Sequence, residues 1–200
     1  MKGFSLRTTF LTLTLAAMAW PASALTVVNT SAPQINCVFS TTCSVVVTDM
    51  GSSIMNGGFI QSRIFQAQPG SPAYPNWVYE YRVNLTNAVG ITHIGYVTSM
   101  SLSFGPVLNY DYNADGNSSD QVFVVTQGGL GTIGLSSAWA FFGAVGFNLA
   151  SPVSQGSFPG NGQSSYFFGL VSPYPPVVVN ASVNTDTGTL SVPVYAPAHP

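Results

Sequence analysis

Oxygen-bearing side chains recur at alternate positions between Asp111 and Asp120. Oxygen donors occupy positions 1, 3, 5 and 10 of this segment and a glycine occupies position 6: Asp111, Asn113, Asp115, Asp120 and Gly116. A calcium-binding loop needs alternate oxygens turned inward and a glycine that lets the chain reverse. The spacing therefore predicts a structural Ca²⁺ site that Asp120 closes. The alternative is a loop whose side chains only cap its own turns.

Groups suited to proton transfer are scarce. General acid–base catalysis uses His, Glu, Asp or Lys, yet the sequence has a single glutamate, Glu80, and two histidines, His93 and His199. We expect His93 in an exposed loop and Glu80 paired with Arg82 on a strand surface. No Gly-x-Ser-x-Gly nucleophile motif occurs. The sequence predicts that the protein is not an enzyme. A glycosidase pair of Glu80 and a loop aspartate is the alternative.

Several aromatic residues fall in or beside expected loops: Tyr74, Trp77, Tyr110, Tyr112 and Tyr174. Aromatic rings offer apolar faces that suit the C–H surfaces of sugars, and neighbouring Asn and Gln side chains suit the hydroxyl groups. The pattern predicts sugar binding, with Tyr74, Trp77, Tyr110 and Tyr112 as the ligand-binding set. Packing of the same rings in the core or as loop anchors is the alternative.

The two cysteines, Cys37 and Cys43, are close in sequence. An oxidising compartment favours a disulfide between them, and their spacing differs from the Cys-x-x-Cys redox motif. The closed loop is short, so the cross-link stabilises by only about 2 kcal/mol. We expect it to fix a hairpin over residues 36–43.

The glycine-rich segment from Gly128 to Gly134 has the composition of a phosphate-binding loop but not its other features. It lacks a Gly-Lys-Ser/Thr end, and no helix pattern follows to present an N-terminus to phosphate. We interpret it as a connection between two strands.

The N-terminus has the three-part pattern of a secretory signal peptide. Lys2 and Arg7 precede an apolar stretch, and Ala22 and Ala24 provide the small residues of a cleavage site. We expect residues 1–24 to be removed, so that the mature chain begins at Leu25 and is secreted. The apolar stretch is too short for a stable membrane span, and a retained anchor is the alternative.

Residues 25–200 contain few charged side chains. They include two arginines and six acidic residues and no lysine, which gives a formal charge of −4. Charged residues make up 5% of the whole chain, against about 25% in ordinary soluble domains. Such a surface has a weak long-range field and cannot attract nucleic acid or anionic lipid. We expect neither partner, and no membrane span in the mature chain.

Hydrophobic residues alternate with polar ones in two segments. In residues 78–86, Tyr79, Tyr81 and Val83 alternate with Glu80 and Arg82. In residues 97–104, apolar residues alternate with three serines. Strict period two predicts half-buried strands, each with one wet face.

Further strand-like runs are separated by Gly, Pro, Asn and Ser clusters, and they cover residues 25–28, 44–48, 59–66, 121–126, 138–149 (with a bend), 166–171, 177–183 and 190–195. A turn at Asp186–Gly188 joins the last two, and Pro193 places the final strand at a sheet edge. About ten antiparallel strands predict an all-β fold, a two-sheet β-sandwich or jelly roll over residues 25–195, followed by a flexible tail at 196–200. A closed barrel is the alternative.

The C-terminal half resembles exported bacterial β-rich proteins of the PEP-CTERM type, the substrates of exosortase. The resemblance lies in residues 120–126 and 163–172, in Pro175-Pro176 and in Ala196-Pro197. It implies a surface or matrix protein of a Gram-negative bacterium. The sorting tail of that group, a Val-Pro-Glu-Pro-like segment, an apolar helix and an arginine cluster, does not occur in the sequence, so anchoring is not implied.

Together these patterns predict a secreted structural or adhesive protein of the cell surface or extracellular matrix, without catalytic activity. Its partners would be other matrix components or copies of itself, because low charge removes the repulsion that keeps sheet edges apart. The alternative is a carbohydrate-binding module that recognises polysaccharide and uses Ca²⁺.

Overall fold

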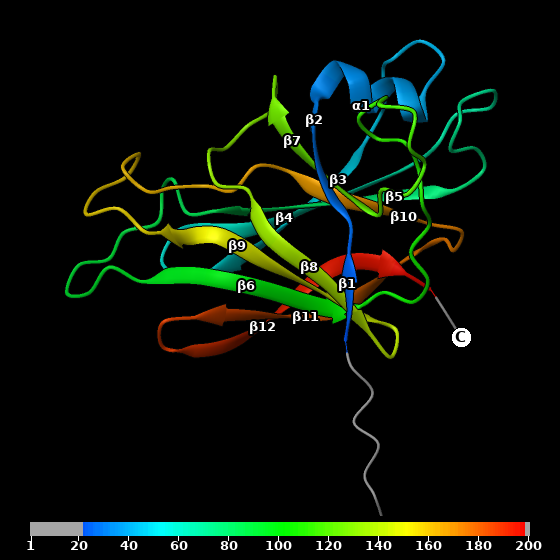
Figure 1. The fold of residues 1–200 in the computed structure, drawn as a ribbon. Helices are drawn as coiled ribbons and strands as arrows, with labels where there is room; N and C mark the ends of the chain where they lie inside the picture. Colours follow the sequence, from blue (N-terminus) through cyan, green and yellow to red (C-terminus); the bar gives the residue numbers. More distant parts are fainter. Residues whose placement is uncertain (1–21, 199–200) are drawn as a thin grey trace, which may run out of the picture.

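The computed structural model describes residues 22–198, which form two six-stranded sheets packed face to face (Figure 1). Sheet A has the strand order β1-β8-β9-β6-β11-β12 and sheet B the order β2-β7-β10-β5-β4-β3. The strands are β1 (Ser23–Leu25), β2 (Val27–Ser31), β3 (Thr48–Ile54), β4 (Gly58–Gln66), β5 (Trp77–Asn84), β6 (Tyr96–Ser103), β7 (Val122–Gln127), β8 (Leu135–Phe141), β9 (Ala144–Ser154), β10 (Phe168–Ser172), β11 (Pro176–Thr185) and β12 (Gly188–Pro197).

The predicted β-sandwich is confirmed, with about twelve strands in place of about ten. The pairs are antiparallel except β2 with β7, which is parallel. The segment predicted as one strand at 25–28 contributes to both sheets, because β1 ends at Leu25 and β2 begins at Val27. The predicted signal peptide lies largely outside the described residues, and β1 begins at Ser23, two residues before the expected mature N-terminus.

The main core lies between the sheets and is rich in aromatic residues. Tyr79 on β5 meets Phe104 edge to face, with ring centroids 5.3 Å apart, and Phe147 on β9 packs 4.9 Å from Phe168 on β10. The two fully buried tyrosines of this core have hydrogen-bonded hydroxyls: Tyr79 Oη donates to the Tyr174 carbonyl at 2.7 Å and Tyr81 Oη to the Tyr195 carbonyl at 2.8 Å. The alternation read from the sequence therefore fixes which residues face this core.

A second core covers the outer face of sheet B. Helix α1 (Ala32–Phe39) lies on the side of sheet B that faces away from sheet A (Figure 1). Phe39 at its end packs against Phe65, Tyr112 and Phe123, with ring centroids 5.4–6.3 Å apart. The expected wet face of residues 78–86 is wrong for this reason: Glu80 and Arg82 lie beneath this layer and are buried.

The predicted hairpin over residues 36–43 is wrong, because its first half is helical. The Ser31 side chain caps the helix by accepting from the Gln34 N–H at 3.3 Å. Pro33 suits the first turn, where no intrahelical partner is needed for its missing N–H. Ile35 and Phe39, four residues apart, place one face of the helix on sheet B. The sequence signals for this short helix are the capping residue Ser31 and the apolar pair Ile35 and Phe39.

Two other strand predictions need correction. Residues 44–47 are not a strand; β3 begins at Thr48 and consists mainly of small and polar residues that carry no clear alternation. The segment 138–149 is a hairpin of β8 and β9 in place of one bent strand. Its two-residue turn, Phe142-Gly143, has positive φ at both positions, the backbone that tight hairpins require.

The last two strands agree with the prediction. β11 and β12 pair antiparallel through a turn at residues 186–187, and β12 with Pro193 forms an edge of sheet A. Ser52 and Ser62 of sheet B hydrogen bond to the β12 backbone at Pro193 and Tyr195 and cover this edge. β12 continues to Pro197, so the first two residues of the predicted tail belong to the sheet and are buried. Among the described residues, no helix is long and apolar enough to cross a membrane.

Candidate functional site

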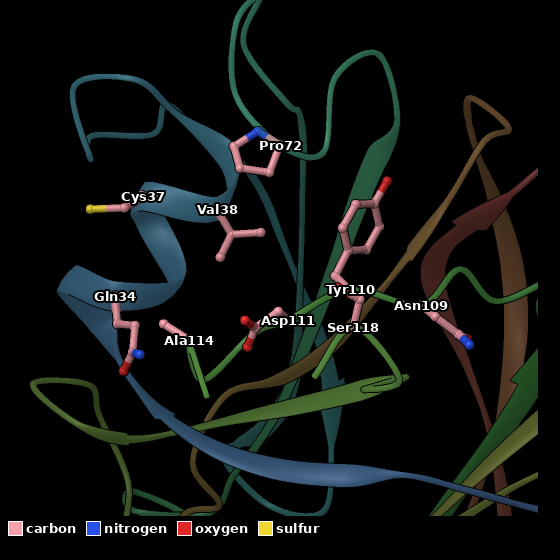
Figure 2. Close-up of a pocket in the computed structure, with 9 residues that line it drawn as sticks. All are labelled: Gln34, Cys37, Val38, Pro72, Asn109, Tyr110, Asp111, Ala114 and Ser118. Atoms are coloured by element: carbon pink, nitrogen blue, oxygen red, sulfur yellow. The ribbon is translucent and has the colours of Figure 1, made fainter. Parts of the chain in front are cut away.

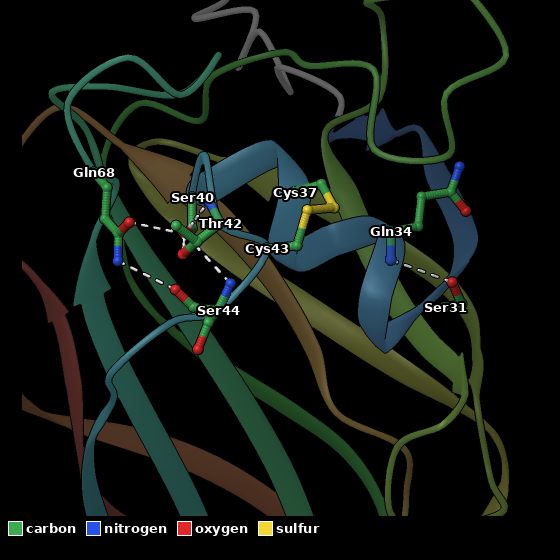
Figure 3. The surroundings of a disulfide bond; sticks show 8 residues. All are labelled: Ser31, Gln34, Cys37, Ser40, Thr42, Cys43, Ser44 and Gln68. Carbon is green, nitrogen blue, oxygen red and sulfur yellow. Dashed lines mark hydrogen bonds between the residues drawn. A yellow bond between two sulfur atoms is a disulfide. The ribbon is translucent and has the colours of Figure 1, made fainter.

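The disulfide holds the end of α1 against the following turn (Figure 3). Cys37 on the helix bonds to Cys43, which confirms the predicted pair. Beside it, the Ser40 hydroxyl accepts from the N–H groups of Thr42 and Ser44 and donates to Gln68 at 2.8 Å. These contacts fix the position of α1 on sheet B.

A pocket of about 680 Å³ lies between α1 and the segment joining β6 to β7 (Figure 2). Gln34 and Val38 line it from the helix, and Tyr110, Asp111 and Ser118 line it from the segment. Its position is set by direct contacts, since Thr30 Oγ1 donates to the Tyr112 carbonyl at 3.0 Å and the Gln34 amide donates to the Asn113 carbonyl.

The carboxylates of the Asp111–Asp120 loop bind the loop's own backbone. Asp111 accepts from the N–H groups of residues 115 and 116 at 3.0 and 2.9 Å, and Asp115 accepts from that of Asn117 at 2.8 Å. Asn113 Oδ1 accepts from the Asp115 N–H at 3.1 Å and its amide donates to the Asp115 carboxylate at 2.9 Å. This is the pattern of side chains that cap turns.

Asp120 differs from these loop residues because its side chain is buried. It is 2% exposed and its Oδ2 accepts from the Tyr112 N–H at 3.0 Å. Burial raises the pKa of Asp120, and the charges of Asp115 and Asp111 raise it further against the effect of that hydrogen bond. Within residues 22–198, no three His, Cys, Asp or Glu side chains gather in a way that could hold a metal ion. The geometry fits the capped loop better than the ion, and Ca²⁺ binding stays a prediction.

The four aromatic residues of the predicted ligand-binding set do not form one surface. Tyr74 is exposed, whereas Trp77 packs against the core between the sheets. Tyr110 lines the pocket and accepts from Asn76 Nδ2 at 2.7 Å. The prediction fails for Tyr112, which is fully buried in the second core with its ring 5.1 Å from that of Phe123.

Glu80 pairs with Arg63 and not with Arg82. The two residues stand opposite each other on β4 and β5, and Arg63 Nη2 and Nε lie 2.6 and 3.0 Å from Glu80 Oε2. Burial raises the pKa of Glu80, while the Arg63 charge and its hydrogen bond oppose this rise. A pocket of about 300 Å³ opens beside this pair.

Both arginines of the described chain meet at one aromatic ring. Arg63 Cζ lies 3.7 Å from the Phe167 ring centroid and Arg82 Cζ lies 5.5 Å from it. No second carboxylate stands among the described residues that line the small pocket. Asp49, whose charge also raises the pKa of Glu80, is exposed and accepts from the Gln61 amide. A two-carboxylate arrangement as in glycosidases is not formed by these residues.

The remaining sequence-based expectations concern loops. His93 is exposed in a loop, as predicted, and its Nε2 contacts the Asp186 carboxylate. The segment from Gly128 to Gly134 connects β7 to β8, as predicted, and its first two glycines line the small pocket.

The outer face of sheet A differs from that of sheet B because no layer covers it in the described chain. None of the six strands of sheet A, within their bounds, contains Asp, Glu, Lys, Arg or His. Trp139 on β8 lies on this face, over Gly146 of β9. No pattern in the sequence selects Trp139 as a site residue. The signal that could have found it is the Phe142-Gly143 turn, which places Trp139 opposite Gly146.

Comparison with known proteins gave no relative: no protein-family model, no curated protein and no solved structure matches this chain. The geometry of the described residues therefore carries the functional argument alone.

Proposed function

We propose that this is an exported, non-catalytic protein that acts outside the cell as a structural or adhesive component of the extracellular matrix. The observation that supports it most is the open outer face of sheet A, whose strands carry no ionisable acid or base at neutral pH. Such a face exerts no electrostatic repulsion on another neutral surface or on a neutral polymer. Serine, threonine and asparagine side chains keep it soluble and supply hydrogen-bond donors and acceptors.

A non-catalytic role is supported by the surroundings of Glu80. This carboxylate, the single glutamate of the chain, is buried and forms an ion pair with the partly exposed Arg63. A variant Glu80→Gln, compared with the unchanged protein on a broad panel of polysaccharides, should show no difference because neither releases sugar. Turnover that disappears in the variant would contradict the proposal.

The proposal is tested by retention on matrix. Exported protein is mixed with extracellular matrix isolated from the producing cells and sedimented, and its self-association is followed by light scattering over a range of concentrations. We expect co-sedimentation with matrix, concentration-dependent assembly, or both. A protein that stays monomeric at high concentration and remains in the supernatant would overturn the proposal.

A carbohydrate-binding module is the second candidate. It is favoured by the presence of solvent-accessible aromatic side chains, of which Tyr74 and Trp139 are examples, beside neutral polar groups. Binding to a glycan array, with and without a chelator, tests the module and its Ca²⁺ dependence together. Sugar-specific retention supports it, and absence of retention on every glycan speaks for the structural role alone.

Calcium at the Asp111–Asp120 loop is tested separately. A ligand that binds only the folded state raises its stability. If the loop binds Ca²⁺, the thermal midpoint rises on adding Ca²⁺ in place of chelator, and Asp111→Asn abolishes the rise. Equal midpoints in Ca²⁺ and chelator would reject calcium and leave the loop as a self-capped connection.

A further inference from the structure

Two rows of residues, most of them polar, cross the outer face of sheet A. The strand register aligns the first row over five strands, in the order Ser137, Asn148, Ser99, Asn184 and Thr189. The second row runs parallel to it, in the order Trp139, Gly146, Ser101, Ser182 and Ser191. Each row crosses the strands, so its members are spaced by the distance between neighbouring strands, about 4.8 Å.

Hydrogen bonds hold the first row in fixed orientations. Asn148 Nδ2 donates to Ser137 Oγ at 2.9 Å, and Asn184 Nδ2 donates to Ser99 Oγ at 2.9 Å. Thr189 Oγ1 donates to Asn184 Oδ1 at 2.8 Å. These side chains lose little further freedom when a ligand binds, which is the advantage of a preorganised surface.

An aromatic ring lies at one end of the second row. A side-chain carbon at position 146 would overlap the indole of Trp139, so the glycine leaves the space in which the ring rests on the sheet. Gly146 is buried beneath it, while Trp139 itself is partly exposed. The indole thus presents apolar surface beside rows of hydroxyl and amide groups.

We propose that the outer face of sheet A binds a neutral, extended polysaccharide, with Trp139 as the stacking platform and the two polar rows as hydrogen-bonding partners. This inference rests on the proposed function and names its ligand class. The indole suits the C–H surface of a pyranose ring. The spacing between neighbouring members of one row is close to the length of one pyranose unit. Because the six strands carry no charged side chain, the face complements an uncharged polymer and offers an anionic one no counter-charge.

Affinity electrophoresis through gels containing soluble neutral polysaccharides (hydroxyethylcellulose and glucomannan), or the anionic polygalacturonate, tests this site. We expect retardation by at least one neutral polymer, little by the anionic one, and no loss of retardation at high salt. Trp139→Ala should weaken binding about tenfold, as for removal of a central aromatic contact. Gly146→Ala, which displaces the indole without removing it, should also weaken binding.

Phe158→Ala is the matched control, because Phe158 is an exposed aromatic residue in the segment joining β9 to β10, outside sheet A and outside the predicted ligand-binding set. Circular dichroism verifies that each variant is folded, and Trp139→Phe keeps a ring if Gly146→Ala unfolds. Retardation unchanged by Trp139→Ala, or abolished by Phe158→Ala, would overturn the site. Co-sedimentation with matrix or self-assembly, without retardation by either neutral polymer, would refute this inference and leave the proposed function standing. Absence of retardation, of co-sedimentation and of self-assembly would refute both.

Discussion

The outer faces of the two sheets are built from strands with similar alternation and have opposite environments. On sheet B, α1 and the segment joining β6 to β7 bury aromatic residues, and the Glu80 carboxylate is buried beside Arg63 at a small pocket that α1 also lines. On sheet A, the alternate positions of β6 are serines that stay at the surface, as in Ser101. Polar alternation therefore identifies the face of a strand that points away from the core, but not whether that face is exposed to solvent.

The two sheets also differ in the charged residues of their strands. Within the strands, charged side chains occur in β3, β4 and β5 of sheet B and in none of sheet A. A charge beneath a covering layer needs a partner, and Arg63 supplies it for Glu80. An open face without charges needs no such pairing and is free to contact a neutral ligand.

The largest expected effect comes from the cover of sheet B. Phe39→Ala should lower the free energy of unfolding by about 3–5 kcal/mol, because it leaves a cavity among the aromatic rings of the second core. Ser101→Ala on the open face should change it by less than about 0.5 kcal/mol. Denaturant unfolding measures both. Similar losses in the two variants would show that the two faces do not differ in this way.

Removing the partner of the buried Glu80 carboxylate should have the next largest effect. Arg63→Met leaves the Glu80 carboxylate without a partner and should cost about 3 kcal/mol, whereas Arg63→Met/Glu80→Met should recover most of it. Without Arg63, burial and the Asp49 charge both raise the pKa of Glu80 unopposed, and stability is then lost as pH rises through that raised pKa. The single variant should therefore be least impaired in acid. A double variant no more stable than the single one would contradict this account.

Removing the cross-link should act locally. Cys37→Ser/Cys43→Ser should lower the free energy of unfolding by about 2 kcal/mol, the value for a short closed loop. Hydrogen exchange should become faster in α1 and stay unchanged in β6 and β9 of sheet A, if the layer over sheet B opens by itself. Equal acceleration in both sheets would show that the layer and the sandwich unfold together.

The smallest effect concerns Asp186, at the turn of the β11–β12 hairpin. Its Oδ1 accepts from the Tyr96 N–H at 3.1 Å, and this bond together with His93 lowers the pKa of Asp186. A lowered carboxyl pKa gives stability that is present at neutral pH and is lost as pH falls below about 4. Asp186→Asn should reduce this loss. The free energy of unfolding, measured at neutral and at acid pH, should then change less in the variant than in the unchanged protein. Parallel pH profiles would exclude the contribution.

Much of the sandwich could be predicted because alternation depends on local side-chain direction. Residues 79–83 and 100–104 place the apolar members of their alternation in the core between the sheets, as expected. The predictions failed where position relative to another element decides: Tyr112 lies under α1, and Glu80 finds Arg63 across a strand pair. Trp139 was missed because its partner Gly146 becomes adjacent only after the hairpin forms.

By itself, the sequence determined the strand content, the disulfide partners and the scarcity of charge, because composition and period two are properties of the chain alone. Tertiary structure decided which face is covered, which groups pair and which aromatic ring meets solvent. These depend on which strands become neighbours and on where α1 packs, and contacts between residues distant in sequence leave no periodic trace in the chain.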